Sequence, residues 1–354
     1  MNRALVDRIA DAVLYEGYIL YPYRPAVKNR QRWTFGGLYP EAYCRAQAAG
    51  DAWSSQTECL VHGGQATAFE AVIRFLHLTE RCVGEFVPPL PDWPGAGEPP
   101  FRPVGTLRVG DRLFHAWQEA EEREVALDAV TLGELSARPH RRTFAFAGGR
   151  RLEPLRGPAG EVRGVLVREQ HPLEGAVEVT ATAAAGLYRV ALVVANRAQL
   201  EDAGRKSRDE IVLRTLVSTH SILGVSRGEF VSLLDPPEDC REAAAACRNF
   251  GTWPVLVGAD GATDTMLSSP IILYDYPQVA PESPGDFFDA AEIDEMLTLR
   301  ILTLTDEEKR AMAGVDERAA ALLARTEGMA REQLRGLHGT LRDLRPVTEE
   351  GGHD

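Results

Sequence analysis

The chain has 354 residues, with 39 Lys and Arg against 52 Asp and Glu, which gives a net charge of -13. This acidity argues against non-specific binding to nucleic acid or to an anionic membrane. The sequence contains neither an apolar run long enough for a membrane span nor a secretory signal, and its five cysteines do not form a disulfide framework. We therefore expect a cytoplasmic bacterial protein with no membrane span.

Apolar residues at helical spacing between Val6 and Leu14 predict a first helix of about three turns, which Gly17 ends. The alternative is that the stretch "AVLYEGYILYPYR" is extended, because Tyr and Ile favour strands. A stretch rich in tyrosine and arginine follows. Two interpretations stay open for it: a surface that grips a protein or a small anion, or tyrosines packed beneath arginine stems. A nucleic-acid site is not expected here. The candidate binding residues are Tyr21, Tyr23, Arg24, Lys28, Asn29, Arg32 and Trp33.

Residues 56–82 predict two strands that form a hairpin at Gly63-Gly64. They also contain a C-x2-H-x14-H-x4-C spacing, which resembles the paired ligands of a zinc site. The alternative is two ordinary cysteines and two half-exposed histidines, because short motifs arise readily by chance. The candidate zinc ligands are Cys59, His62, His77 and Cys82.

Residues 83–107 are rich in proline and glycine, and we expect a surface loop. Residues 108–234 contain several strand-like segments between turn signals, which favours a β-rich domain. A further hairpin is predicted at Arg227-Gly228. The G-x-S-x-G motif around Ser226 is not a nucleophile elbow, because no helix can follow the serine directly.

From residue 235 to residue 345 the chain is predicted to be mostly helical, with a flexible tail at 346–354. Asp235 and the prolines after it mark a helix that would run through Phe250. Further helices are expected at 285–303, 306–313, 315–326 and 328–342. With an N-terminal α/β segment at 1–82, the fold class is α+β: a central antiparallel, sandwich-like β-rich domain with a helical C-terminal region.

No P-loop, dinucleotide-binding fingerprint, H-E-x-x-H or C-x-x-C motif occurs in the sequence. An enzyme is therefore not the favoured class, and no cofactor is expected, with zinc as an alternative. The proline-punctuated segment "SSPIILYDYPQVAPESPGD" carries apolar residues and two tyrosines. We predict that its Tyr274 and Tyr276 contribute to a partner-binding surface.

Several longer phrases, among them "TECLVHGG", "STHSILGV", "GEFVSLLDPPE", "WPVLVG" and "DTMLSSPIILYDYPQVAPESPGDFFDAAEIDEMLTLRILTLTDEEK", resemble a family of bacterial proteins. That family is associated with gene clusters for nickel-iron uptake hydrogenases of the actinobacterial type. The resemblance covers most of residues 10–325. It implies an accessory role in making, assembling or anchoring a hydrogenase, and it carries no catalytic residues over to this chain.

The expected function is therefore a non-catalytic accessory, assembly or maturation protein that acts through protein–protein contacts, with hydrogenase subunits as candidate partners. Two alternatives remain. One is an enzyme or binding protein for a small anionic ligand at the Tyr/Arg/Lys stretch. The other is an interaction module stabilised by zinc.

Overall fold

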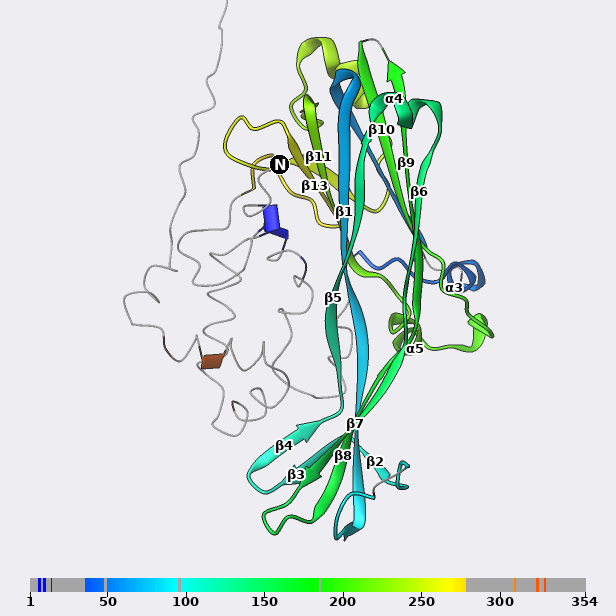
Figure 1. Ribbon diagram of the computed structural model, residues 1–354, viewed down its shortest axis with the longest axis vertical. Coiled ribbons are helices and arrows are strands. Elements are labelled where there is room, and N and C mark those ends of the chain that lie inside the picture. The colour runs from blue at the N-terminus through cyan, green and yellow to red at the C-terminus, as the bar shows by residue number, and fades with distance from the viewer. Residues whose placement is uncertain are drawn as a thin grey trace, which may run out of the picture.

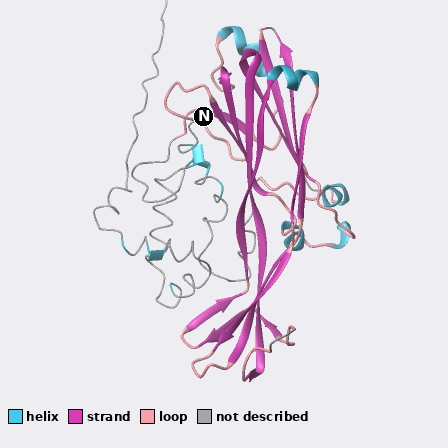
Figure 2. Cartoon of the chain, in the orientation of Figure 1, coloured by secondary structure: helices cyan, strands magenta, loops and turns pink. Residues whose placement is uncertain are grey.

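The computed structural model describes residues 6–7, 9–10, 14, 36–47, 50–94, 97–184, 186–277, 309, 323–324 and 328. Within these residues the chain is mostly antiparallel strand with few, short helices (Figure 2). The strands are β1 Ser54–Leu90, β2 Arg102–Val104, β3 Thr106–Val109, β4 Arg112–His115, β5 Trp117–Thr131, β6 His140–Phe146, β7 Gly149–Arg156, β8 Val162–Gln170, β9 Leu173–Ala184, β10 Leu187–Asn196, β11 Val217–Val231, β12 Trp253–Leu256 and β13 Thr265–Ser269. The helices are α3 Glu41–Ala46, α4 Leu132–Ala137, η2 Ala203–Arg205, α5 Arg208–Val212, η3 Glu238–Cys240 and α6 Arg241–Ala245.

One very long strand, β1, organises the fold, since it pairs with five other strands along its 37 residues. One of its edges is occupied in turn by β10, β5 and β2, and the opposite edge by β11 and then β8. Figure 1 shows the result: a large upper lobe and a small lower lobe that share this strand. The expected domain boundary at residues 82–83 therefore falls inside β1.

In the upper lobe, β1 and β11 bend together without separating. Gly63 pairs with Gly228, and pairing resumes between Ala68 and Ser226 after a bulge in β1. Figure 1 shows both strands folding over at the top of the lobe. The hairpins predicted at Gly63-Gly64 and at Arg227-Gly228 are therefore wrong, because at both glycine positions the chain bends and continues its strand.

This bend produces two layers with the main core between them. One layer contains β6, β9, β10 and the start of β1, and the other contains the remainder of β1 with β5, β11, β13 and β12. Alternate residues of β1, such as Val61, Ile73 and Phe75, point into the core, as period-2 strands require. The predicted antiparallel, sandwich-like β-rich domain is confirmed.

The lower lobe is a small sheet formed by the end of β1 with β2, β7 and β8, against which the β3–β4 hairpin packs. Much of the Pro/Gly-rich segment belongs to it. Residues 83–90 continue β1, and the Phe101 ring lies directly over Gly84, where a Cβ atom would come within 2.3 Å of it. The loop predicted over 83–107 is therefore wrong for these residues, because the missing Gly84 side chain lets the excursion fold back onto the strand.

The helical predictions have mixed outcomes. In the N-terminal segment, the described residues Val6, Asp7, Ile9, Ala10 and Leu14 are helical, as predicted, and Val6 and Ile9 pack on the outer face of the upper lobe. The helix expected from 235 to 250 is reduced to η3 and α6, because Phe250 turns away to pair with the backbone of Gln56. The predicted helices beyond residue 285 lie essentially outside the described residues.

Candidate functional site

The predicted N-terminal binding residues, Tyr21, Tyr23, Arg24, Lys28, Asn29, Arg32 and Trp33, lie outside the described residues. The end of the same stretch is described. There Tyr39 and Tyr43 are buried with ring centroids 5.8 Å apart, and the Arg208 guanidinium lies over the Tyr39 ring and donates to its hydroxyl at 2.6 Å. At this end, the alternative of tyrosines packed beneath arginine is the one the structure adopts.

The four candidate zinc ligands do not come together. His62 lies at the bend of β1, Cys59 lies before it in the main core, and His77 and Cys82 lie on the straight part of the strand beyond Ala68. A strand rises about 3.3 Å per residue, so Cys82 is roughly 45 Å from the bend. One tetrahedral ion cannot bind all four side chains, and no other cluster of three or more His, Cys, Asp or Glu residues suited to a metal occurs in the described part of the chain.

The two histidines of this set make other contacts instead. The His77 ring is fully buried and its Nε2 donates to the carbonyl oxygen of His171 at 2.8 Å, while burial lowers its pKa to about 4. Nε2 of His62 lies 3.6 Å from Sγ of Cys240, whose pKa is raised by burial among apolar neighbours. A thiol in such surroundings is a poor nucleophile.

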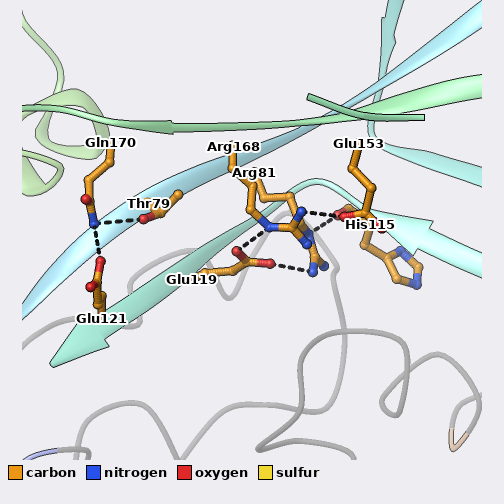
Figure 3. Close-up of polar contacts among 8 residues, drawn as sticks. All are labelled: Thr79, Arg81, His115, Glu119, Glu121, Glu153, Arg168 and Gln170. Atoms are coloured by element: carbon orange, nitrogen blue, oxygen red, sulfur yellow. Dashed lines mark hydrogen bonds and ion pairs between the residues drawn. The ribbon is translucent and has the colours of Figure 1, made fainter. Parts of the chain in front are cut away.

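Where the two lobes meet, charged side chains form a network across one face of the sheet (Figure 3). The carboxylate of Glu119 on β5 accepts from Arg81 on β1 and from Arg168 on β8, both at 2.8 Å. Arg168 also donates to Glu153 on β7, and Arg81 donates to the carbonyl oxygen of His115. These contacts link four neighbouring strands at the junction of the two lobes, which we call the waist. Along the chain of contacts, positive and negative side chains alternate.

A second group of polar contacts lies two residue pairs further along the same strands. The side-chain amide of Gln170 donates to Thr79 at 3.0 Å and to Glu121 at 3.2 Å (Figure 3). Arg81 is nearly inaccessible to solvent, so the nearby carboxylate of Glu119 contributes strongly to compensating its charge. The network locks the register of the strands that carry the lower lobe.

Beside this network lies a cavity of about 690 Å³, which we call the waist cavity. Its walls come from β1, from the start of β5, and from the segment 206–214 that contains α5. The lining residues are Glu80, Arg81, Cys82, Gly105, Thr106, Ala116, Trp117, Gln118, His171, Lys206, Asp209, Glu210, Leu213 and Arg214. Its volume is in the range of small-molecule sites. Apart from Cys82, sequence reasoning found none of these residues, since they are scattered over the chain.

The segment that follows β13 presents side chains outward. Ile272 is 73% exposed and Tyr274 53% exposed, whereas Leu273 between them is buried. Asp275 holds the end of the segment by accepting from the Ser232 hydroxyl at 2.5 Å and from the backbone N–H of Leu256 at 2.7 Å. A segment held in this way shows its apolar residues in one fixed arrangement.

The two tyrosines predicted for partner binding have different positions. Tyr274 is exposed, as a binding residue must be. Tyr276 is partly buried, packs against the main core and donates its N–H to the Leu256 carbonyl oxygen at 2.7 Å. Tyr276 therefore holds the segment in place, and the exposed side chains of the segment are those of Ile272 and Tyr274.

Backbone pairing with a partner strand is blocked at this edge. β12 is the last strand of the sheet on this side, and the polar groups of Leu256 that point outward already bind Asp275 and Tyr276. Since the outward position alternates along a strand, the previous one is Pro254, which has no N–H to donate. A partner would have to recognise side chains here.

No protein-family model matches this chain, and no curated protein matches it at a significant level. None of the helices in the described part of the chain has the length and apolar character that crossing a bilayer requires.

Proposed function

We propose that this chain is a non-catalytic accessory protein that acts through protein–protein contact in the assembly or maturation of a metalloenzyme, and that this enzyme is a nickel-iron hydrogenase. The observation that carries the contact is the segment around Ile272 and Tyr274. Its apolar side chains are exposed while its backbone is fixed by Leu273, Asp275 and Tyr276. A pre-ordered apolar surface loses little conformational entropy on binding, which favours affinity.

The choice of a hydrogenase rests on the sequence phrases quoted above, several of which run through this same segment. The choice of an accessory role, instead of an enzyme, rests on the kind of surface exposed: a tyrosine, which is a type enriched at interface hot spots, beside an isoleucine. Exposed apolar residues of this size lower the solubility of a protein, so a partner that covers them would explain why they are exposed.

The test is affinity purification of the tagged chain from its native host, in which hydrogenase subunits should co-purify. Replacing Ile272 and Tyr274 together by serine should abolish this co-purification. Val87→Ser is the matched control, because Val87 is equally exposed, at 71%, but lies in the lower lobe. Absence of hydrogenase subunits from the wild-type preparation, or their equal retention by the double variant, would overturn the assignment of this surface.

The role itself is tested by deleting the gene and measuring hydrogen uptake and processing of the hydrogenase large subunit. Both should be impaired in the deletion strain and restored by the wild-type gene. Normal uptake together with normal processing would overturn the hydrogenase assignment.

A further inference from the structure

The strand path of the main sheet ends in β12 on one side and in β6 on the other. At β12, Pro254, Asp275 and Tyr276 leave few backbone groups for pairing. β6 is seven residues long, contains no proline, and pairs with β9 along one of its edges. In the part of the chain that the structure describes, no strand pairs with the other edge, which lies at the margin of the upper lobe (Figure 1). An open edge of this kind can accept one more strand.

The hydrogen bonds of β9 show which backbone groups of β6 point outward. The N–H of Arg197 donates to the carbonyl oxygen of Glu174 at 2.8 Å, so the even-numbered residues of β9 turn their polar groups towards β10. Because this direction alternates along a strand, the odd-numbered residues of β9 bind β6. Their partners in β6 have even numbers, since Arg142 lies opposite Val177. The β6 residues whose N–H and C=O groups point away from the sheet are therefore Arg141, Thr143 and Ala145.

This edge is complementary to itself. Thr143 is the middle residue of β6, so two copies that pair antiparallel about Thr143 overlap along the whole strand. In that register, Arg141 lies opposite Ala145 of the second copy, and Thr143 lies opposite Thr143. Each outward residue then exchanges both of its backbone hydrogen bonds with an outward residue of the other copy. The neighbouring register, centred on Arg142, would place two arginines opposite each other, which is unfavourable.

The charges on the outer face fit the same register. The exposed Arg141 donates its Nε–H to Glu178 of its own copy, which leaves its Nη groups for a further acceptor. In the second copy, the exposed Glu174 lies directly behind Ala145, on the neighbouring strand. Two strand spacings, about 10 Å between Cα atoms, separate Arg141 from this carboxylate side chain. An arginine and a glutamate can span that distance across an alanine.

The core-facing side of β6 is also compatible with this pairing. Arg142 of one copy lies opposite Phe144 of the other, and an arginine packs favourably on an aromatic ring. We propose that two copies of this chain pair through β6 and form one continuous sheet across a symmetric dimer. Because β12 is at the far end of the strand path, Ile272 and Tyr274 remain exposed in this dimer.

Sedimentation of the full-length protein tests the proposal. The wild type should be dimeric at about 100 μM, a concentration that reveals even a weak dimer. Thr143→Pro removes an outward N–H that β9 does not bind, so this variant should be monomeric with an unchanged circular dichroism spectrum. Thr143→Val keeps that N–H and should remain dimeric. A monomeric wild type, or a folded Thr143→Pro variant that is still dimeric, overturns the proposal.

Disulfide cross-linking tests the register and leaves the backbone groups in place. In the proposed dimer, Thr143→Cys brings two cysteines opposite each other, at a Cα separation of about 5.5 Å that a disulfide can bridge. Ala145→Cys is the matched control, because its two cysteines would lie more than about 13 Å apart along the strands. Mild oxidation should cross-link the first variant and leave the second at the level of the wild type. Equal cross-linking of both variants, or none in Thr143→Cys, overturns the proposal.

A charge reversal tests the contact on the outer face. Glu174→Arg should raise the dissociation constant of the dimer at least about tenfold, because two ion pairs are replaced by repulsion between like charges. Glu201→Arg makes the same change at an exposed position outside the strands and should leave the dissociation constant unchanged. Equal dissociation constants for the two variants would contradict the proposed register.

Discussion

Gly63 on β1 and Gly228 on β11 pair directly at the point where both strands bend over, and the Thr67 side chain lies against both glycines. The Thr67 hydroxyl donates to the Arg227 carbonyl oxygen at 2.6 Å and accepts from the Gly64 N–H at 3.0 Å. A Cβ atom on Gly228 would lie 2.8 Å from the backbone oxygen of His62. The bend therefore needs two glycines and one threonine in register.

Replacing Gly228 by alanine is expected to destabilise the protein by about 1–3 kcal/mol, since the new methyl group overlaps backbone as well as Thr67. Urea unfolding followed by circular dichroism measures the change. Gly64→Ala is the matched control, because a Cβ atom at Gly64 would have no neighbour within 4 Å and its cost should be smaller. Equal midpoints for the two variants would show that the bend tolerates a side chain.

The hydroxyl of Thr67 should contribute separately. Thr67→Val keeps the shape but removes both hydrogen bonds and leaves the Arg227 carbonyl oxygen without this donor, so we expect a loss of about 1–2 kcal/mol. The control is Thr182→Val on the exposed surface of β9, which should be close to neutral. If the two substitutions cost the same, the hydrogen bonds at the bend are not important for stability.

Removing the charge of Glu119 should weaken the waist. Glu119→Gln removes the negative charge that accepts from the buried Arg81, and we expect a loss of about 2–3 kcal/mol, somewhat below the cost of breaking a fully buried pair. The exposed pair of Arg141 and Glu178 provides the control. Glu178→Gln should cost less than about 0.5 kcal/mol, because solvent screens that pair. Chemical denaturation at constant pH compares the two.

Stability should fall on mild acidification. His77 and His220 are buried, and burial lowers the pKa of each from 6.5 to about 4. Between these values the unfolded chain binds protons that the folded chain does not, so stability is retained above pH 6.5 and is lost as the pH falls towards 4. Urea midpoints measured from pH 7.5 to pH 4.5 give the slope.

The variant His220→Asn measures how much of this dependence of stability on pH comes from His220. In His220→Asn, the side-chain N–H can replace Nδ1, which lies 2.7 Å from the Ser218 carbonyl oxygen, but the group no longer titrates. The dependence of stability on pH should therefore be shallower than in the wild type. An unchanged slope would mean that His220 does not contribute to the acid sensitivity.

The β-rich character of the chain follows from the sequence alone, because strands alternate apolar and polar residues over short windows. The sequence also located both bends, since Gly63-Gly64 and Arg227-Gly228 were identified as turning points. The helix starts at Thr131 and Ser207 were readable too, because each has a glutamate three residues later that completes a capping box. These two helices are short and were not predicted.

The role of those glycines depends on long-range strand pairing, which local sequence does not show. A glycine pair permits a hairpin reversal and a bend in a continuing strand equally well, and the choice depends on whether a distant strand stays paired through it. The same holds for the sites. The zinc-like spacing was local in sequence but is spread along β1, while Glu80, His171 and Arg214 meet because strand register and the segment around α5 bring distant residues to one cavity. Sequence spacing identifies residues that are close along the chain, whereas the residues of this cavity are close to one another across the sheet.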